Sequence, residues 1–283
     1  MRITRKGEQL VKKNQLLVIT LVMIFTLGLL ISGCGQNEKE TSSINQNEQG
    51  DNSLERVKNA GEITFSMSGG YPPFNYYDEK NQLVGFDIDV CNEVAKRLDV
   101  EFKAVPNEWS GIVEGLRSGV YDGILGSMAI TEERNAVVDF SIPYYYSGAQ
   151  LLVREDSLLQ SKEELEGKKV GLVTGTTFEG DANKLKADVK LYKDDNQTLM
   201  ELQNKNLDAV ITDRVVGITA INNSEFDVKL LGKPLRSEDI AVAFRQEDDT
   251  LREAVNEVLQ AMHDDGTLST LSEKWLKQDI STK

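Results

Sequence analysis

The sequence has few of the residues on which several kinds of protein chemistry depend. Its one histidine, His263, stands at a predicted helix end beside Asp264 and Asp265, where an ordinary structural role explains it. The chain therefore offers no histidine with a nucleophile and no metal-binding cluster, and we expect no catalytic residues, no metal and no cofactor. Basic residues are also in the minority, with 32 Lys and Arg against 46 Asp and Glu. A formal net charge of −14 repels nucleic acid and anionic lipid headgroups, so neither is an expected partner.

Cysteine is nearly absent, and its two positions have different meanings. Residues 1–33 combine five basic residues with a 16-residue apolar stretch, 16–31, which is short of the roughly 20 residues that a spanning helix needs. Small residues then precede Cys34, as in a bacterial lipobox, so we predict a signal peptide that is cut before a lipidated Cys34. The alternative is a plain N-terminal membrane anchor. Either way, the rest of the chain is expected outside the cytoplasmic membrane.

Loss of residues 1–33 would leave Cys91 as the one cysteine besides Cys34, so no disulfide is expected within the folded part. We expect Cys91 to be a small buried side chain. Residues 34–53 are rich in Gln, Asn, Glu and Ser and predict a flexible tether. The cut removes five basic residues and one acidic residue, which leaves 27 Lys and Arg against 45 Asp and Glu, a net charge of −18.

The remaining 230 or so residues predict two moderate α/β units. Short β-rich runs at 62–67, 101–106, 168–173 and 207–212 alternate with helix-period segments at 86–98, 109–117, 195–204 and 248–264. An internal echo supports two similar halves. Residues 117–127 and 203–213 share one design, which places Ser127 opposite Asp213, although common strand-and-turn patterns could also produce it. Two open sheets that face each other would form a ligand cleft at their strand ends.

The segment "GSMAITEER" carries the most suggestive charge, Arg134. It follows a predicted strand end, with Thr131 as a helix N-cap. A guanidinium matches a carboxylate bidentately, so we predict that Arg134 binds the carboxylate of a ligand. The alternative is an ion pair with Glu132, Glu133 or Asp139 on the surface.

Other candidates lie in the loops at predicted strand ends. Tyr71 in "GGYPPF" and Trp109 in "NEWSG" could enclose a small ligand, although core packing is the plainer explanation for Trp109. In "TGTTFE", Thr176 and Thr177 offer hydroxyl and N–H groups to an anion, or form an ordinary turn and cap. Asp213 is placed to receive an ammonium group, or to pair with Arg214 or cap the next helix.

Several stretches together resemble the family 3 extracellular solute-binding proteins, the amino-acid receptors of ABC importers. The matching stretches are "GYPPFNYYDEKNQLVGFDIDV", "WSGIVEGLRSGVYDGILGSMAITEERNAVVDFSIPYYYSG", "LEGKKVGLVTGTT", "LDAVITDR" and "DGTLSTLSEKW". The resemblance covers about residues 54–275 and implies a type II periplasmic-binding-protein-like fold. Its two α/β lobes, joined by a two-strand hinge with the ligand cleft between them, would comprise 54–147 with 240–283, and 148–239.

The resemblance also implies roles for individual residues. Arg134 would hold the α-carboxylate of an amino acid with N–H groups at Ala129 and Thr177. Asp213 and a carbonyl near Gly126 or Ser127 would hold the α-ammonium, while Tyr71 and Trp109 enclose the side chain. The remaining implied partner is an ABC permease, and the receptor would be a monomer held at the membrane by its lipid alone, on the cell surface in a Gram-positive organism.

Two departures from the family pattern affect the expected ligand. Ala129 replaces the Ser or Thr of many relatives, so only its backbone can serve the carboxylate. Ser68 stands where receptors for basic or amide side chains often have Asp, which weakens the case for arginine, lysine or histidine. We therefore predict a polar amino acid such as cystine or glutamine. The alternative class is a cleft enzyme of the cyclohexadienyl dehydratase type, with Glu108, Glu133 or Glu179 as its acid.

Overall fold

The computed structural model describes residues 50–224 and 226–283, so the predicted signal peptide (1–33), Cys34 and most of the predicted tether lie outside it. The described part is mixed α/β, as predicted. Helix α2 begins at Ser53, inside the predicted tether 34–53, because its first turn is tied to helix α9 (Asp249–Asp264). The Ser53 and Thr250 hydroxyls lie 3.0 Å apart, and the Asp51 carboxylate accepts from the Ser53 N–H at 2.8 Å.

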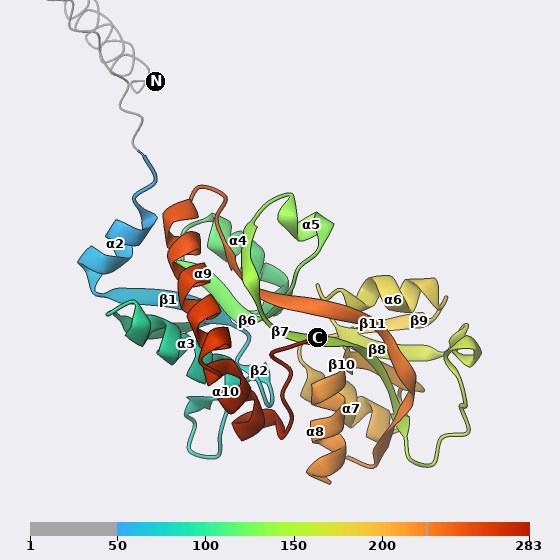
Figure 1. The fold of residues 1–283 in the computed structure, drawn as a ribbon. Coiled ribbons are helices and arrows are strands. Elements are labelled where there is room, and N and C mark those ends of the chain that lie inside the picture. The colour runs from blue at the N-terminus through green and yellow to red at the C-terminus, as the bar shows by residue number, and fades with distance from the viewer. Residues whose placement is uncertain (1–49, 225) are drawn as a thin grey trace, which may run out of the picture. The chain divides into compact units, whose positions relative to one another are not determined.

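The centre of the fold is an eight-stranded sheet in the order β5-β1-β6-β11-β7-β10-β8-β9 (Figure 1). Its strands are β1 (Glu62–Met67), β5 (Glu101–Pro106), β6 (Gly123–Ala129), β7 (Asp139–Arg154), β8 (Lys169–Val173), β9 (Asp188–Tyr192), β10 (Ala209–Asp213) and β11 (Val228–Phe244). A small second sheet contains β2 (Gly70–Tyr71), β3 (Asn75–Tyr77) and β4 (Leu83–Val84). Four of these strands agree closely with the predicted β-rich runs.

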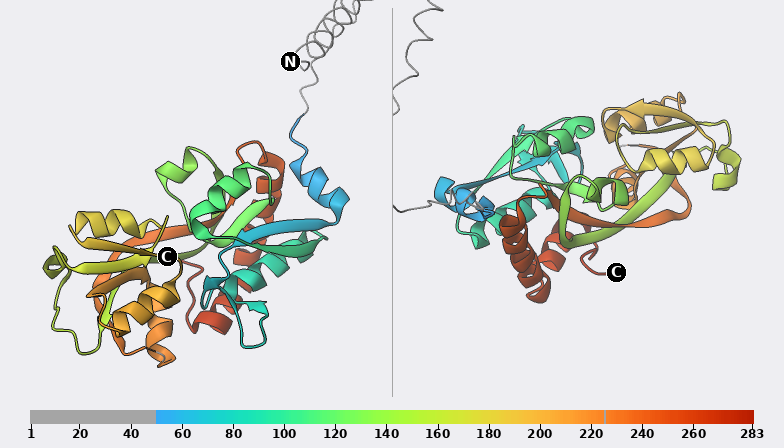
Figure 2. Two further views of the ribbon diagram at one scale, coloured as in Figure 1. Left: turned by 180° about the vertical axis from the view of Figure 1, so that it is seen from behind. Right: turned by 90° about the horizontal axis from the view of Figure 1, so that it is seen from above.

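Two long antiparallel strands, β7 and β11, pair from Phe244↔Asp139 at one end to Val228↔Arg154 at the other. They run side by side in the middle of the sheet and extend from one half of the fold to the other, as the view from above in Figure 2 shows. On one side β6 pairs with β11 and leads to β1 and β5, which we call the first lobe. On the other side β10 pairs with β7 and leads to β8 and β9, which we call the second lobe. The prediction of two lobes joined by two strands is therefore confirmed, although its residue boundaries stay a prediction.

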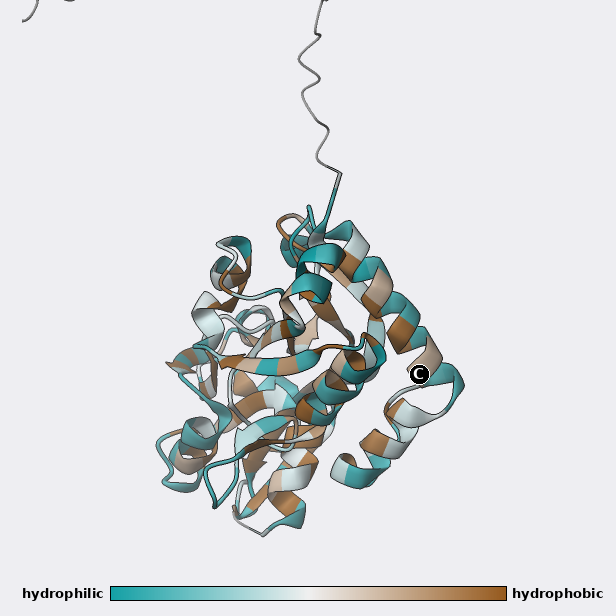
Figure 3. Ribbon diagram, turned by 90° about the vertical axis from the view of Figure 1, so that its left-hand side faces the viewer, coloured by the Kyte–Doolittle hydropathy of each residue, from teal (hydrophilic) through white to brown (hydrophobic). Residues whose placement is uncertain are grey.

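Helices cover both faces of the strands in each lobe (Figure 1). Those of the first lobe are α2 (Ser53–Ala60), α3 (Phe86–Arg97), the 3-10 turn η1 (Trp109–Gly111), α4 (Ile112–Arg117), α5 (Glu132–Asn135), α9 and α10 (Thr267–Leu276). Those of the second lobe are η2 (Lys162–Leu165), α6 (Phe178–Lys184), α7 (Asp195–Gln203) and α8 (Arg214–Asn222). Hydrophilic and hydrophobic residues alternate along these helices, so one face of each can be buried (Figure 3).

Alternating side chains of the strands fill separate apolar layers. In β6, Leu125 belongs to the cluster under α3 and α9, whereas Ile124 packs with Ile112 and Leu116 of α4. In β10, Ile211 packs with residues of α6 and β8, and Val210 packs with Leu199 and Leu202 of α7. Each lobe is therefore a sheet between two helical layers. Cys91 is free and fully buried in the first of these clusters, as expected.

The internal echo in the sequence corresponds to a repeated structural unit. Asp122, just before β6, accepts the Thr64 N–H at 2.9 Å and returns its own N–H to Thr64 O. Asp208, just before β10, accepts the Lys169 N–H at 2.9 Å and returns its N–H to Lys169 O. Both aspartates thus fix the start of a strand against its parallel neighbour. The opposite ends of β6 and β10, at Ser127 and Asp213, face one pocket.

Candidate functional site

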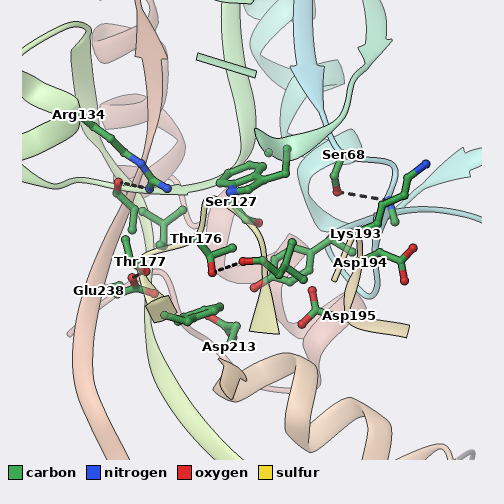
Figure 4. A pocket seen from close by; sticks show the side chains of 18 residues that line it. Ser68, Ser127, Arg134, Thr176, Thr177, Lys193, Asp194, Asp195, Asp213 and Glu238 are labelled. Carbon is green, nitrogen blue, oxygen red and sulfur yellow. Dashed lines mark hydrogen bonds between the residues drawn. The ribbon is translucent and has the colours of Figure 1, made fainter. Parts of the chain in front are cut away.

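A pocket between the two lobes is lined by eighteen residues (Figure 4). They include all nine predicted ligand-binding residues, Tyr71, Trp109, Gly126, Ser127, Ala129, Arg134, Thr176, Thr177 and Asp213. The nine that were not predicted as ligand contacts are Ser68, Gly70, Val173, Phe178, Lys193, Asp194, Asp195, Glu238 and Ile240. Figure 4 shows Arg134 at one end of the view and Ser68, Lys193 and Asp194 at the other. Arg134 and Glu238 thus lie toward one end, and Lys193 lies with Asp194 and Asp195 toward the other, which we call the acidic end.

Arg134 is held by neutral groups. Thr131 caps α5 as predicted and accepts the Arg134 N–H at 3.1 Å. The guanidinium donates to Ala129 O at 2.8 Å and to Gly175 O at 3.4 Å, and its carbon lies 5.6 Å from the centre of the Trp109 ring. Within the described ranges no carboxylate lies within 4.0 Å of it, so the alternative of a surface ion pair is wrong for this structure. Burial lowers the pKa of Arg134, yet a guanidinium stays charged at neutral pH.

Trp109 lines the pocket and also packs against the apolar core of the first lobe. It is half-buried at the start of η1 and packs at the edge of the cluster around Ile112 and Leu116. Its indole N–H donates to Gly175 O at 3.2 Å. Because Gly175 belongs to the second lobe, this bond and the one from Arg134 join the lobes at the same carbonyl.

Asp213 is 2% exposed and ends β10. Its Oδ1 accepts the Val215 N–H at 2.7 Å and the Ser147 hydroxyl at 2.9 Å, so it does cap helix α8. Arg214 donates instead to the side-chain oxygen of Gln150, at 3.2 Å. Burial, with nearby Glu238 and Asp195, raises the pKa of Asp213 to about 7. Both of these hydrogen bonds use Oδ1 of Asp213, and the residue also lines the pocket.

The end of β6 supplies the opposite wall. Gly126 is required there, because a Cβ would lie 2.8 Å from Met67 Cβ. Ser127 has a positive φ of 64° and is fixed by its N–H to the Tyr144 hydroxyl and by its own hydroxyl to Asp87, both at 2.9 Å. Asp87 also accepts from Tyr144 and Asn75, while burial raises its pKa to about 6. This network holds the strand end rigid.

The loop "SGGYPPF" brings Tyr71 to the pocket through a turn at Gly69, whose φ is 71°. The Tyr71 ring stacks on Phe74 with 5.2 Å between the ring centres. Phe74 in turn stacks on Tyr145 at 5.1 Å. Tyr71 is thus a pocket wall supported from behind by two aromatic rings.

Thr176 and Thr177 line the pocket, but their hydroxyl hydrogens are used within the protein. Thr176 donates to Val173 O at 2.7 Å, and Thr177 donates to Glu238 at 2.6 Å. Glu238, on β11, is 7% exposed and also binds Arg236 at 2.8 Å. Glu238 was not predicted from the sequence. The available signal was a pair of acidic residues that precedes an apolar run, "EDIAVAF".

Three further residues that were not predicted follow strand β9, namely Lys193, the N-cap Asp194 and the first residue of α7, Asp195. Lys193 forms an ion pair with Glu108 of the first lobe at 2.6 Å, and Asp194 caps α7 by accepting the Gln197 N–H at 2.9 Å. Asp195 is 5% exposed, accepts the Thr212 hydroxyl, and has its pKa raised to about 7, first by burial. The signal that could have identified them was their position in the sequence. The segment "KDD" follows a strand and begins a helix, as the other loops of the pocket do.

The part of the chain that the structure describes lacks two features. No group of three or more His, Cys, Asp or Glu side chains there is arranged to hold a metal ion. No helix in residues 50–224 or 226–283 has both the length and the apolar character to cross a membrane.

Comparisons with known proteins place this geometry in context. Residues 63–278 match the family described as bacterial extracellular solute-binding proteins, family 3. The L-cystine-binding protein TcyJ of Escherichia coli (strain K12) is 32% identical over 232 residues, which is 81% of this chain and 87% of that protein. A mutant of ArgBP from T. maritima has a TM-score of 0.75 at 34% identity and covers 80% of this chain and 100% of its own. AncCDT-1, an ancestral amino acid-binding protein and precursor of cyclohexadienyl dehydratase, has a TM-score of 0.75 at 32% identity, with 79% and 99% covered.

Proposed function

Because the chain belongs to the bacterial extracellular solute-binding proteins of family 3, we propose that its pocket binds a polar amino acid outside the cytoplasm for delivery to an ABC permease. The observation that carries this proposal is the pair of charges that the pocket presents. Arg134 has no carboxylate partner in the described residues, and Asp213 is buried with no cation. An α-amino acid supplies one carboxylate and one ammonium, and so satisfies both.

Each predicted contact has a group available in the structure. The ligand carboxylate binds the guanidinium of Arg134, with N–H groups at Ala129 and Thr177 as further donors. Its ammonium binds Asp213 and a carbonyl near Gly126 or Ser127. Tyr71 and Trp109 enclose the side chain, and the engaged hydroxyls of Thr176 and Thr177 shape the wall.

The capture mechanism is closure of the two lobes about β7 and β11. The lobes would comprise residues 54–147 with 240–283, and residues 148–239. Contacts between the lobes favour the closed form. They are the two bonds to Gly175 O and the ion pair between Lys193 and Glu108. A ligand that binds Arg134 from one lobe and Asp213 from the other adds attraction that the open form lacks.

The location follows from the residues that precede the described part. We propose that residues 1–33 are a signal peptide and that Cys34 carries a lipid, with a flexible tether up to helix α2. The receptor would then work as a monomer beside its permease, anchored by lipid alone on the outer face of the cytoplasmic membrane. A plain N-terminal anchor remains the alternative, and mass determination of the exported chain distinguishes the two.

The enzyme alternative gains little from the pocket. Glu108 is paired with Lys193, Glu179 accepts the Gly175 N–H at 2.7 Å, and Glu133 lines a different hollow. None of these three lines the pocket between the lobes, although Glu133 and Glu179 line the neighbouring hollow that Arg134 also reaches. Among the acidic residues that line the pocket, Asp213 and Asp195 have pKa values raised to about 7, which suits proton transfer.

A melting-temperature screen tests the proposal. The full chain, purified in mild detergent and refolded to remove carried-over ligand, is heated with each of the twenty amino acids, cystine, ornithine, citrulline and a carboxylated cyclohexadiene. A ligand at 100 times its dissociation constant adds about 2.7 kcal/mol, which is a rise of several degrees for this size. A rise with one or a few α-amino acids supports the receptor. A rise with the cyclohexadiene alone would replace it with the enzyme.

A further inference from the structure

The acidic end of the pocket contains a carboxylate that an ordinary amino acid would leave unused. Of the charged lining residues, Lys193 is paired with Glu108, and Glu238 is paired with Arg236, both within 2.8 Å. Asp194 is only partly buried and caps helix α7. The proposed amino acid would occupy Arg134 and Asp213. Asp195 then remains as a buried carboxylate without a cation.

The surroundings of Asp195 show that it is not a surface group turned inward by chance. It is 5% exposed, at the start of helix α7, and its Oδ1 accepts the Thr212 hydroxyl. In the described residues the Thr212 hydroxyl and the Asp195 backbone N–H are the donors to its carboxylate, and no cation pairs with it, although the residue lines the pocket and its side chain is drawn there in Figure 4. A buried carboxylate without a counter-charge is costly, so its place in a ligand cavity points to a cation from outside.

The position of Asp195 identifies which part of a ligand would reach it. Its neighbour Asp194 lies across the cleft from the loop of the first lobe, since a Cβ placed on Gly70 would be 3.5 Å from Asp194 Cβ. Ser68, in that loop, offers only a hydroxyl, which donates to Asn75 at 3.1 Å. The second lobe therefore supplies the carboxylate at the end of the pocket away from Arg134. The side chain of a ligand whose α-carboxylate is on Arg134 extends toward this end.

We propose that the ligand carries a second ammonium group, on its side chain, and that Asp195 binds it. The inference rests on the amino-acid receptor function. Two kinds of ligand share this chemistry, namely diamino acids such as ornithine, and cystine, whose second ammonium is accompanied by a second carboxylate. Asp195 is thereby the residue that distinguishes these ligands from neutral amino acids of similar length.

A purely structural role for Asp195 would use the same contacts, so the test must separate the two. Asp195→Asn keeps an acceptor for the Thr212 hydroxyl and nearly the same shape, but removes the negative charge. Asp188→Asn is the control, because it removes an exposed carboxylate of the same lobe that pairs with Lys190 and does not line the pocket. Unchanged melting temperatures of the free variants would show that both fold normally.

Calorimetric titration of the full chain with ornithine, cystine and glutamine decides the matter. We expect ornithine or cystine to bind at least tenfold more tightly than glutamine, and which of the two is preferred names the ligand class. Asp195→Asn should remove this preference by weakening the ammonium-bearing ligand at least tenfold, while its affinity for glutamine changes less than threefold. Asp188→Asn should change the affinity for each ligand less than threefold. Equal binding of glutamine by the native chain, or equal weakening of all ligands by Asp195→Asn, would overturn the inference and leave the receptor function intact. Binding of no amino acid would reject both.

Discussion

The strands β6 and β10 are the same structural unit used twice, once in each lobe. At their starts the two units agree, because Asp122 and Asp208 exchange equivalent backbone bonds with Thr64 of β1 and Lys169 of β8. At their ends they differ. Strand β6 leads through Ser127 to the cation Arg134, whereas β10 ends on the carboxylate Asp213.

This difference shows how one scaffold can bind a zwitterion. The shared starts hold each strand against its neighbour, and the differing ends offer opposite charges from opposite lobes. Neither lobe alone can satisfy both ends of an amino acid. In the proposed mechanism binding therefore favours closure, and the selectivity for charge is divided between the lobes rather than concentrated in one.

The largest expected effect comes from removing the charge of the first lobe. Arg134→Ala leaves the ligand carboxylate in a partly dry cleft without its partner, so affinity should fall a hundredfold or more. Titration calorimetry measures the loss, with the exposed Arg117→Ala as control. Affinity within threefold of the native value would mean that the carboxylate binds elsewhere.

Substitutions at the starts of β6 and β10 should have similar effects. They should lower the stability of the fold and leave ligand affinity unchanged, unlike substitutions at the strand ends. Asp122→Ala and Asp208→Ala each strip the acceptor from a backbone N–H, at Thr64 and Lys169, and should lower the free energy of unfolding by about 1–2 kcal/mol. Urea denaturation gives these values, and calorimetry should find ligand affinity unchanged within twofold. A selective loss of binding from either variant would break the division between scaffold and site.

Much of this arrangement could be predicted from the sequence because its signals are local. The alternation of short β-rich runs with helix-period segments predicted the α/β layers. Small residues and aromatics after the runs marked the loops of Tyr71, Trp109 and Thr176, and the echo of "YDGILGS" and "LDAVITD" predicted the paired units. All nine site residues lie in one pocket, although their roles as ligand contacts remain predictions.

What could not be predicted depends on distant chain segments. Glu238 and Asp195 are pocket residues only because β11 and α7 are brought beside the "TGTT" loop and β10. The use of the Thr176 and Thr177 hydroxyls inside the protein was equally hidden, since their acceptors, Val173 O and Glu238, depend on the folded loop. Local pattern identified the loops, and tertiary packing decided which of their atoms remain available.

Neutralising the second lobe should matter less than neutralising the first. Asp213→Asn keeps an acceptor for the Val215 N–H and the Ser147 hydroxyl, so helix α8 stays capped while the ion pair with the ligand ammonium is lost. We expect affinity to fall about tenfold, because a neutral acceptor still binds the ammonium more weakly. A ligand analogue without the α-amino group should bind the variant nearly as well as the parent ligand does. If the variant prefers the parent ligand over this analogue as strongly as the native chain does, the ligand ammonium does not bind Asp213.

The pH dependence separates the lobes further, because Arg134 stays charged while Asp213 titrates. With a pKa of about 7 in the folded free protein and 3.8 as its ordinary value, Asp213 holds a proton that the unfolded chain has lost between about pH 4 and 7. The stability of the free protein should therefore fall as pH rises through that window. Ligand affinity should instead rise with pH, because the ligand ammonium binds the ionised carboxylate of Asp213. For one carboxyl with this pKa the rise is about threefold between pH 6.5 and 7.5. The charges that face Asp213 are Glu238 and Asp195. Binding without proton release in calorimetry at pH 6.5 would contradict this.

The smallest effect should come from the ion pair that joins the lobes at the surface. Lys193 and Glu108 are more than half exposed, so solvent and salt screen their attraction. Lys193→Gln should weaken ligand binding less than about threefold, and the difference should vanish at 1 M salt. A larger, salt-independent loss would show that Lys193 contacts the ligand directly. Cystine makes this outcome informative, because its second carboxylate would lie near the second ammonium at Asp195, within reach of the same lysine. A loss for cystine alone, with ornithine unaffected, would therefore assign Lys193 to the ligand and extend the pairing of opposite charges to both ends of the pocket.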